Sequence, residues 1–217
     1  MAVVGRRRKM IDHQKILVWD WPVRVGHWLL VILFALAWLT GDSEELRLVH
    51  AALGGGLVGI LLFRVLWGLI GTDHARFSSF VRGRQAVWGY VASLLIPSSR
   101  SQEPEYAGHN AAAGWAILAL LGLGLLTGVT GWVAYQGEAW EGLGEVHEFL
   151  ASAMLGVALF HVAGVAVSSL THGENLTWAM FSGYKLGRPD EAIANAHPLA
   201  VPLLLAWVTV CAWWFTL

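Results

Sequence analysis

Four of the nine histidines in this sequence lie inside or at the edge of long apolar stretches, where a polar side chain usually has a function. Two of them, His147 and His161, share one stretch and are fourteen residues apart, which is ~21 Å along a helix axis. Fourteen residues are two heptads, so both rings point to nearly the same side, with a drift of about 40°. His27 and His50 lie in two further stretches.

Depth in a membrane sorts these four histidines into two pairs. The first stretch ends near Gly41, fourteen residues after His27, whereas His50 and His147 begin their own stretches. His50 and His147 are therefore expected in one outer layer, and His27 and His161 in an inner layer ~21 Å deeper. A lone membrane histidine often serves helix packing. Two pairs at matching depths indicate metal ligands instead.

The chemistry that suits two facing imidazoles is a six-coordinate, low-spin iron in a b-type haem, so we predict two haem b groups. With both axial positions filled, such an iron transfers electrons and does not activate oxygen. Zinc is disfavoured because no carboxylate or thiolate completes a four-ligand set. A pigment-binding protein is another alternative, but chlorophyll magnesium usually takes one axial ligand. The single cysteine, Cys211, excludes disulfides and a covalent CxxCH haem attachment.

Arginines and glycines near the histidines are candidates for holding the haems. Arg64 is fourteen residues after His50, and a membrane arginine needs an anion, so an inner haem propionate is its expected partner. Snorkelling to the surface is the alternative. Arg24 is a second propionate candidate, with lipid phosphate as its alternative. Gly55 and Gly59 would let a flat macrocycle approach the backbone, or they serve close helix packing.

The remaining five histidines are expected at the cytoplasmic ends or surfaces: His13, His74, His109, His172 and His197. For His109 three roles stay open, namely contact with a propionate, capping of a helix, and a place in a quinone site. That quinone site has two possible positions. One lies on the inner side near Arg64 and His109, and the other lies on the outer side.

Membrane helices are the elements that must position these residues. The chain has 217 residues, of which 56% are hydrophobic and 13% charged, and its 13 tryptophans are typical of membrane interfaces. We expect one or two interfacial helices between the second and third of the helices below. We predict an all-α membrane protein with a four-helix haem-binding bundle in residues 1–190 and an additional C-terminal transmembrane helix in residues 191–217. The predicted helices are Val23–Thr40, Leu48–Ile70, Ala111–Tyr135, Val146–Leu170 and Leu199–Leu217.

Charge bias predicts the orientation of these helices. One side carries basic residues: Arg6, Arg7, Arg8, Lys9, Lys15, Arg24, Arg76, Arg82, Arg84, Arg100, Lys185 and Arg188. The other side carries acidic residues against the single Arg47: Asp42, Glu44, Glu45, Glu138, Glu141, Glu145 and Glu148. The N-terminus is therefore expected in the cytoplasm, and the C-terminus outside if the fifth helix spans. Nothing in the sequence indicates a nucleic-acid partner.

The stretches WDWPVRVGHW, LVHAALGGGLVGILLFRVLWGLIGTDHARFSSFVRG, GHN and EVHEFLASAMLGVALFHVAGVAVSSLTHGENLTWAMFSGYK resemble the bacterial di-haem cytochrome b family. This family includes the b-type cytochrome subunits of nickel–iron hydrogenases and related small membrane cytochromes. The resemblance covers about residues 16 to 188. It implies a multi-pass protein of the bacterial inner membrane with two b haems on three helices, at positions that match His27, His50, His147 and His161. The fifth helix departs from the family's four-helix core, and a partner contact or a homodimer surface are its open roles.

The resemblance also implies that electrons pass between a periplasmic redox partner and the quinone pool of a respiratory chain. We therefore expect an electron-transfer subunit of an oxidoreductase rather than a stand-alone enzyme. The acidic outer side would attract a basic partner, such as a c-type cytochrome, and a hydrogenase-like partner is the other candidate. The alternative function is a self-sufficient superoxide:quinone oxidoreductase. The acidic side argues against it, because it would repel an anionic substrate.

Overall fold

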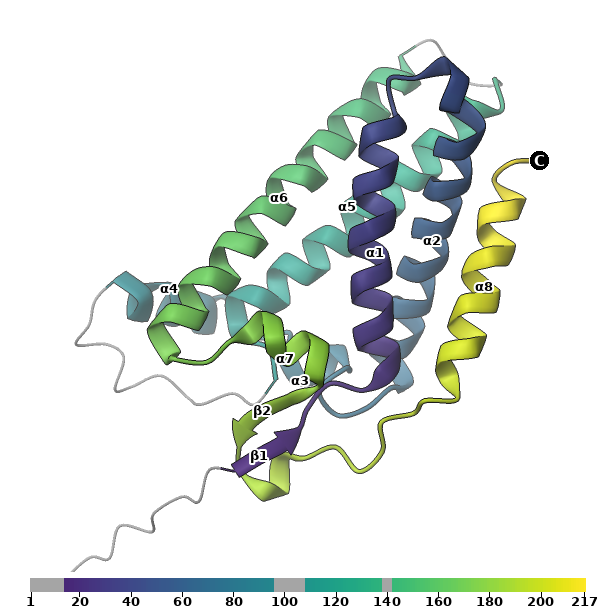
Figure 1. Ribbon diagram of the computed structural model, residues 1–217. Coiled ribbons are helices and arrows are strands. Elements are labelled where there is room, and N and C mark those ends of the chain that lie inside the picture. Colours follow the sequence, from purple (N-terminus) through teal and green to yellow (C-terminus); the bar gives the residue numbers. More distant parts are fainter. Residues whose placement is uncertain (1–13, 96–107, 138–141) are drawn as a thin grey trace, which may run out of the picture.

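The computed structural model describes residues 14–95, 108–137 and 142–217. Four of its helices are long and apolar enough to cross a membrane, and they lie side by side as a bundle (Figure 1). They are α1 (Trp21–Thr40), α2 (Arg47–Ile70), α5 (Ala111–Tyr135) and α6 (Leu143–His172). The predicted all-α membrane fold is confirmed. We call the end of the bundle near His50 and His147 the outer end, and the opposite end the inner end.

Local capping determines where two of these helices begin. Asp20 precedes α1, and its side chain accepts the backbone N–H of Val23 over 2.8 Å, with Pro22 in the first turn. Asn110 caps α5 in the same way, accepting the N–H of Ala113 over 2.8 Å. The cap of α1 explains why this helix starts two residues before the predicted Val23.

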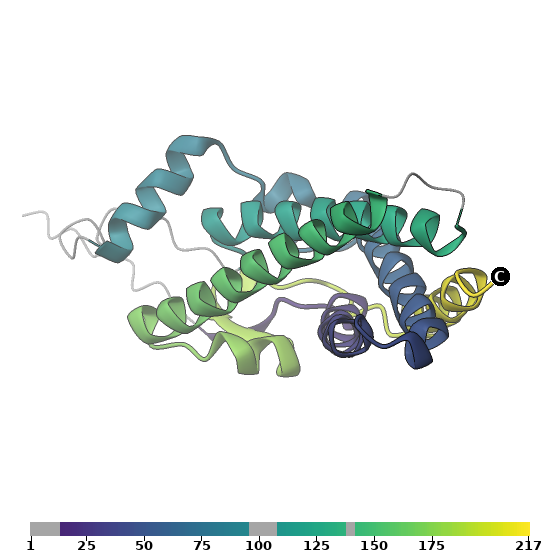
Figure 2. The ribbon, with the colours of Figure 1, turned by 90° about the horizontal axis from the view of Figure 1, so that it is seen from above.

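The bundle is organised around α2, which packs along α1 and α5, while α5 in turn packs along α6. The view from above shows α1 and α6 as separate helices, which α2 and α5 connect to one another (Figure 2). Among the described residues, α1 and α6 are not a closely packed pair. The two helices that carry the inner histidines therefore face one another without interdigitating.

The fifth apolar stretch forms α8 (Ala200–Trp214), a helix of 15 residues. At 1.5 Å per residue it is about 22 Å long, which is shorter than a hydrocarbon core of about 30 Å. It lies along α2, and the indole N–H of Trp207 donates to the carbonyl of Gly59 over 2.9 Å. The C-terminal helix is thus present, but it is shorter than the predicted Leu199–Leu217.

Short elements close the inner end of the bundle. Between α2 and α5 the chain forms α3 (Phe77–Phe80) and α4 (Arg84–Leu95), in the region where one or two interfacial helices were predicted. The inner end also holds α7 (Leu176–Ser182), strands β1 (Gln14–Leu17) and β2 (Tyr184–Gly187), and the 3-10 helix Pro189–Glu191. A further 3-10 helix, Glu44–Leu46, joins α1 to α2 at the outer end. The strands pair antiparallel, from Gln14 opposite Gly187 to Leu17 opposite Tyr184.

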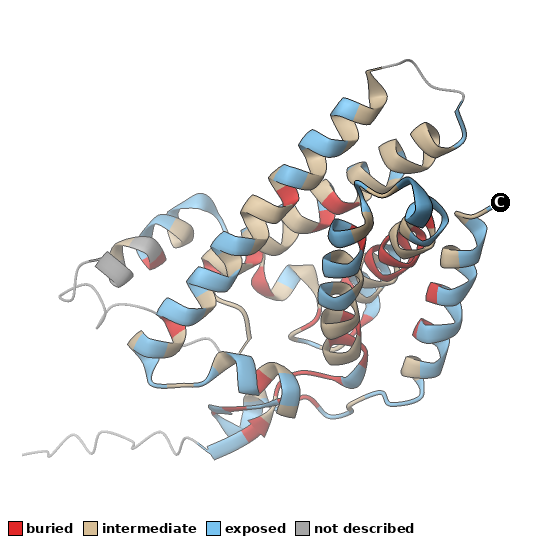
Figure 3. Ribbon diagram, turned by 45° about the horizontal axis from the view of Figure 1, so that its top comes forward, coloured by how far each residue is buried: buried red, intermediate tan, exposed pale blue. Residues whose placement is uncertain are grey.

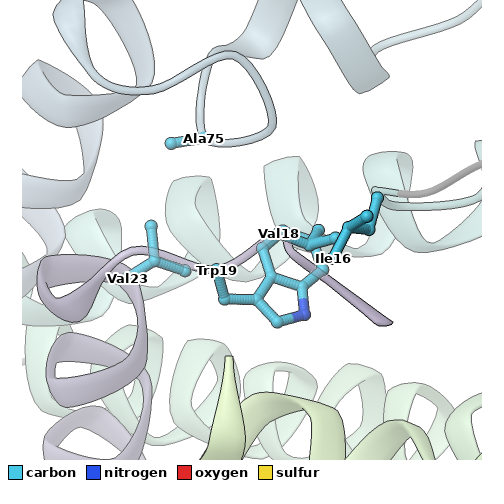
Figure 4. Packing of buried hydrophobic residues seen from close by; sticks show 5 residues of the cluster. All are labelled: Ile16, Val18, Trp19, Val23 and Ala75. Atoms are coloured by element: carbon cyan, nitrogen blue, oxygen red, sulfur yellow. The ribbon is translucent and has the colours of Figure 1, made fainter. Parts of the chain in front are cut away.

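The most buried side chains lie at the inner end and around α2. One cluster joins the segment before α1 to the turn after α2, and its members are Ile16, Val18, Trp19, Val23 and Ala75 (Figure 4). A second cluster of Ile60, Leu204 and Val208 joins α2 to α8. By contrast, exposed residues run along the outward faces of α6 and α8 (Figure 3). Apolar side chains on these faces suit contact with lipid.

Candidate functional site

The structure brings His50 and His147 together at the outer end. His50 lies in the first turn of α2, and His147 lies at the beginning of α6. Their ring centres are 6.0 Å apart, and the ring planes are nearly perpendicular at 85°. These two histidines from distant parts of the chain therefore form the pair that depth matching predicted.

Each ring of this outer pair is oriented by a backbone carbonyl of a neighbouring helix. Nδ1 of His50 is 2.9 Å from the carbonyl oxygen of Ala37, and Nδ1 of His147 is 2.9 Å from that of Thr127. A carbonyl can only accept, so Nδ1 carries the proton in both rings. In the neutral imidazole Nε2 then has a free lone pair, which is the arrangement of a metal-ligating histidine.

The spacing of the outer rings fits a metal held between them. With metal–nitrogen bonds of about 2 Å, imidazoles on opposite sides of one metal have ring centres about 6 Å apart. Within the described ranges, no group of three or more His, Cys, Asp and Glu side chains could hold a metal ion. A haem supplies four equatorial nitrogens itself, so it needs only the two axial ligands that this pair offers.

The inner pair is His27 on α1 and His161 on α6. His161 lies near enough to His27 to act on it electrostatically. Nδ1 of His27 is buried and has no hydrogen-bond partner in the part of the chain described. Trp28 stands edge-on to His27 at 5.0 Å between ring centres, and it stacks on Phe181 at 4.0 Å.

Several buried N–H donors gather around the inner pair without a protein acceptor. They are Nε of Arg24, Nε1 of Trp28, Nη1 of Arg64 and Nδ1 of His109, as far as the described residues go. A buried donor without a partner costs about 1–3 kcal/mol, so such atoms indicate an acceptor outside the polypeptide. The carboxylates of haem propionates have the charge and geometry for this role. The residues present therefore fit an inner haem as well.

The two arginines also contact aromatic rings. Arg24 donates to the carbonyl of Phe181, and its guanidinium lies 4.1 Å from the ring centre of Trp21. Arg64 lies 5.3 Å from the ring centre of Phe77 and 5.7 Å from that of Phe80. These contacts hold the guanidinium groups at the inner end of the bundle, where they were predicted.

His109 lies at the inner end between Trp19 and Phe80, at 4.5 Å and 4.8 Å between ring centres. Burial lowers the pKa of His109 well below its ordinary value, and the nearby charge of Arg64 lowers this pKa further. His109 is therefore neutral near pH 7. Asn110, and not His109, caps α5, so helix capping is removed from the three roles considered for this histidine.

Asp20 is a site-supporting residue that the sequence analysis missed. Its carboxylate is fully buried, and besides capping α1 it accepts the indole N–H of Trp67 over 2.9 Å and the hydroxyl of Thr72 over 2.6 Å. An aspartate before Trp-Pro at the start of an apolar stretch is a recognisable N-cap pattern. The donors that Asp20 meets across the bundle, Trp67 and Thr72, have no sequence pattern that predicts this contact.

The structure corrects the predicted role of Gly55 and Gly59. A Cβ added at Gly55 would lie 2.6 Å from the carbonyl oxygen of Cys211, and one at Gly59 would lie 2.9 Å from the Cβ of Cys211. Both glycines therefore give α8 its close approach to α2. The open side that was expected to receive a macrocycle is occupied by a helix, in agreement with the helix-packing alternative.

The outer end carries the acidic residues that the charge bias predicted. The described ones are all exposed: Asp42, Glu44, Glu45, Glu145 and Glu148. Arg47 is turned towards the end of α5, where it donates to the carbonyl of Tyr135 over 3.1 Å. Some residues used in the prediction lie outside the described ranges: Arg6, Arg7, Arg8, Lys9, Arg100, Glu138 and Glu141.

Comparison with known proteins gives two matches. The family model described as "Prokaryotic cytochrome b561" matches residues 18–183, which is well over half of the chain and includes all four paired histidines. A "Probable Ni/Fe-hydrogenase B-type cytochrome subunit" from Rhizobium leguminosarum bv. viciae is 27% identical over 168 residues, covering 65% of this chain and 70% of the relative. No solved structure matches.

Proposed function

The chain belongs to the prokaryotic cytochrome b561 family, and from that membership we propose a di-haem cytochrome that carries electrons across the membrane. What the family establishes is coarser: this is a multi-pass bacterial membrane protein, a haem b cytochrome of electron transfer. The proposal adds the number of haems, their ligands and the partners at either end.

The observation that carries the proposal is the outer pair, His50 and His147. Each ring has its Nδ1 proton donated to a carbonyl, so each keeps an Nε2 lone pair that can bind a metal. When bound, haem b supplies an iron that gains and loses one electron. The two histidines would hold this iron and leave it no open site for oxygen or substrate, so electron transfer would be its task.

His27 and His161 hold the inner haem in this proposal, and the buried donors of Arg24 and Arg64 bind its propionates. A positive guanidinium beside a carboxylate in a low-dielectric site is the arrangement that makes a membrane arginine tolerable. The two haem layers are ~21 Å apart along α6, from His147 to His161. Together they give a stepwise electron path from one face of the membrane to the other.

The outer end is the docking face for a periplasmic redox protein in this proposal. Its exposed carboxylates favour a partner with a basic face, such as a small c-type cytochrome, by long-range attraction. The name of the Rhizobium relative makes a hydrogenase a second candidate partner. Quinone is the other electron carrier, with the inner-end region around Arg64 and His109 or the outer end as its site.

A superoxide:quinone oxidoreductase is the less favoured candidate. The exposed carboxylates at the outer end repel an anion that approaches from that side. Rapid reduction of the haems by superoxide, with no protein partner present, would reverse this preference.

Haem stoichiometry tests the proposed function directly. The purified protein is compared with His50→Ala, His27→Ala and the control His172→Gln by pyridine haemochrome assay and reduced-minus-oxidised spectra. We expect two b haems per chain in the wild type and the control, and about one in each pair variant. A folded wild type with one haem or none, or a His50→Ala variant with both haems, would overturn the proposal.

A further inference from the structure

Each histidine of the outer pair is held by the same set of groups on the helix beside it. On α1, the carbonyl of Ala37 accepts Nδ1–H of His50 over 2.9 Å. The single hydroxyl proton of Thr40 is shared between that same carbonyl, over 3.1 Å, and the carbonyl of Leu36, over 2.8 Å. Nδ1 of His50 also lies 3.4 Å from Oγ1 of Thr40.

The same set recurs on α5. The carbonyl of Thr127 accepts Nδ1–H of His147 over 2.9 Å. The single hydroxyl proton of Thr130 is shared between this carbonyl, over 3.1 Å, and the carbonyl of Leu126, over 2.9 Å. In both places the long helix that precedes the histidine's own helix presents a carbonyl and a threonine to the histidine in the same way.

A glycine follows the threonine in both places and lies against the histidine ring. A Cβ added at Gly131 would come within 2.6 Å of Cε1 of His147, which is too close for a real side chain. At Gly41 the corresponding distance to Cε1 of His50 is 3.6 Å, an ordinary contact. The sequences are LAWLTG for residues 36–41 and LTGVTG for residues 126–131, with Leu, Thr and Gly in equal positions.

We propose that Thr40–Gly41 and Thr130–Gly131 are two matching clamps that position the ligands of the outer haem and raise its reduction potential. The inference deepens the proposed function and rests on it, since it takes His50 and His147 as axial ligands. In each clamp the carbonyl fixes the tautomer of the ring, and at Gly131 the missing side chain also makes room for the ring. The threonine hydroxyl sets how strongly that carbonyl holds the ring's proton.

The effect on potential follows from two donors sharing one acceptor. A carbonyl oxygen that already accepts a hydroxyl proton accepts less strongly from a second donor. Nδ1–H of the histidine is then pulled less towards the carbonyl, and the ring keeps less imidazolate character. A less electron-rich axial ligand stabilises ferric iron less, so the potential is higher than it would be without the hydroxyl.

The test replaces one hydroxyl and keeps its shape. Thr130→Val removes the donor, Thr130→Ser keeps it, and Thr209→Val is the matched control on α8, where the hydroxyl bonds to the carbonyl of Leu205 over 2.9 Å. Midpoint potentials are measured by redox titration of the α-band, in the full protein and in the His27→Ala background, which retains only the outer haem. The electron paramagnetic resonance signals of the ferric protein report the axial ligands independently.

We expect Thr130→Val to lower the midpoint potential of the outer haem and to leave the midpoint potential of the inner haem unchanged. Thr130→Ser should restore the potential, and Thr209→Val should not change it. An outer haem whose potential is the same in Thr130→Val as in the wild type would overturn the inference. Equal shifts in the valine and serine variants would also overturn it, because the hydroxyl would then not be the cause.

The room that Gly131 leaves for the His147 ring is tested by measuring how much haem a variant retains. Gly131→Ala is expected to lose the outer haem or its low-spin signal, because the methyl group displaces the His147 ring. Gly122→Ala on the same helix, where an added Cβ meets nothing within 4 Å, should keep both haems. If instead His50→Ala keeps both haems, the proposed function itself fails. The two failures are therefore distinguishable by haem count before any potential is measured.

Discussion

The indole N–H of Trp67, near the end of α2, donates to Oδ2 of Asp20, just before the start of α1, over a distance of 2.9 Å. The hydroxyl of Thr72 donates to the same oxygen over 2.6 Å, while Oδ1 caps α1. One buried carboxylate thus ties together the inner ends of α1 and α2. As the cap it fixes the start of α1 at Trp21, six residues before His27, and so fixes the position of that histidine.

Asp20→Asn is expected to destabilise the protein without removing the haems. An amide group cannot accept from all three donors, so at least one buried donor loses its partner, at a cost of about 1–3 kcal/mol. Thermal unfolding in detergent, followed by circular dichroism, measures the loss. Asp190→Asn, which changes an exposed carboxylate that pairs with Arg188 on the surface, is the matched control. Equal unfolding temperatures for the two variants would contradict the role of Asp20.

Gly59→Ala separates helix packing from haem packing. The added methyl group meets Cys211 and the backbone of Val208 on α8, so we expect a loss of stability of about 1–3 kcal/mol with unchanged haem content. Gly54→Ala, where an added Cβ meets nothing within 4 Å, should change neither quantity. If the Gly59→Ala protein lost haem but kept the stability of the wild type, this glycine would contact a haem rather than pack against α8.

Arg64→Leu is expected to lower the midpoint potential of the inner haem or to release that haem. In the proposed site the guanidinium would favour the added electron and neutralise a propionate, so its removal would act against reduction. Redox titration with haem quantification measures both effects. Arg84→Leu, at an exposed position in α4, removes the same charge away from the histidine pairs and should leave both potentials in place.

The paired substitution Glu44→Gln with Glu45→Gln should slow electron exchange with a basic c-type cytochrome. It should also make the rate less sensitive to salt, since the attraction that steers the partner is weaker. Stopped-flow measurements over a range of ionic strengths test this. Asp73→Asn with Asp190→Asn makes the same change of charge at the inner end, and an equal slowing there would argue against docking at the outer end.

Acidification is expected to destabilise the protein partly through His109. The unfolded chain binds a proton at this histidine below about pH 6.5, whereas the folded protein, in which its pKa is lowered, does not. The contribution of His109 to stability is therefore complete above that pH and falls as the pH decreases below it. The drop in unfolding temperature between pH 7 and pH 5 should be smaller in His109→Gln than in the wild type.

The sequence predicted the four long helices well because their signals are local. An apolar stretch of the right length and a cap such as Asp20 or Asn110 are enough to place a helix to within a few residues. Depth matching also placed His50 opposite His147, since a helix converts sequence spacing into distance along its axis. The predicted inner ligands, His27 and His161, follow from the same conversion and stay a prediction.

Features that depend on pairing across the chain were not predictable. Strands of four residues, such as Gln14–Leu17, carry little signal of their own, and nothing local indicates that β1 pairs with β2. From the sequence, Gly55 and Gly59 could equally well contact a haem or another helix, and only the position of α8 decides between these two roles. The carbonyl partners of the histidine rings are set by how neighbouring helices are rotated, which composition does not report.

The pairing of β1 with β2 has a consequence for the assembly of the protein. Val18 and Trp19 donate their backbone N–H groups to the carbonyl of Gly183, over 2.9 Å and 3.0 Å. During synthesis the N-terminal segment leaves the ribosome first, while its partner strand follows only after all four long helices have been made. The inner end of α1 must therefore wait, unpaired, while the rest of the chain is inserted. The inner end of the bundle is therefore completed only after the four long helices have been made.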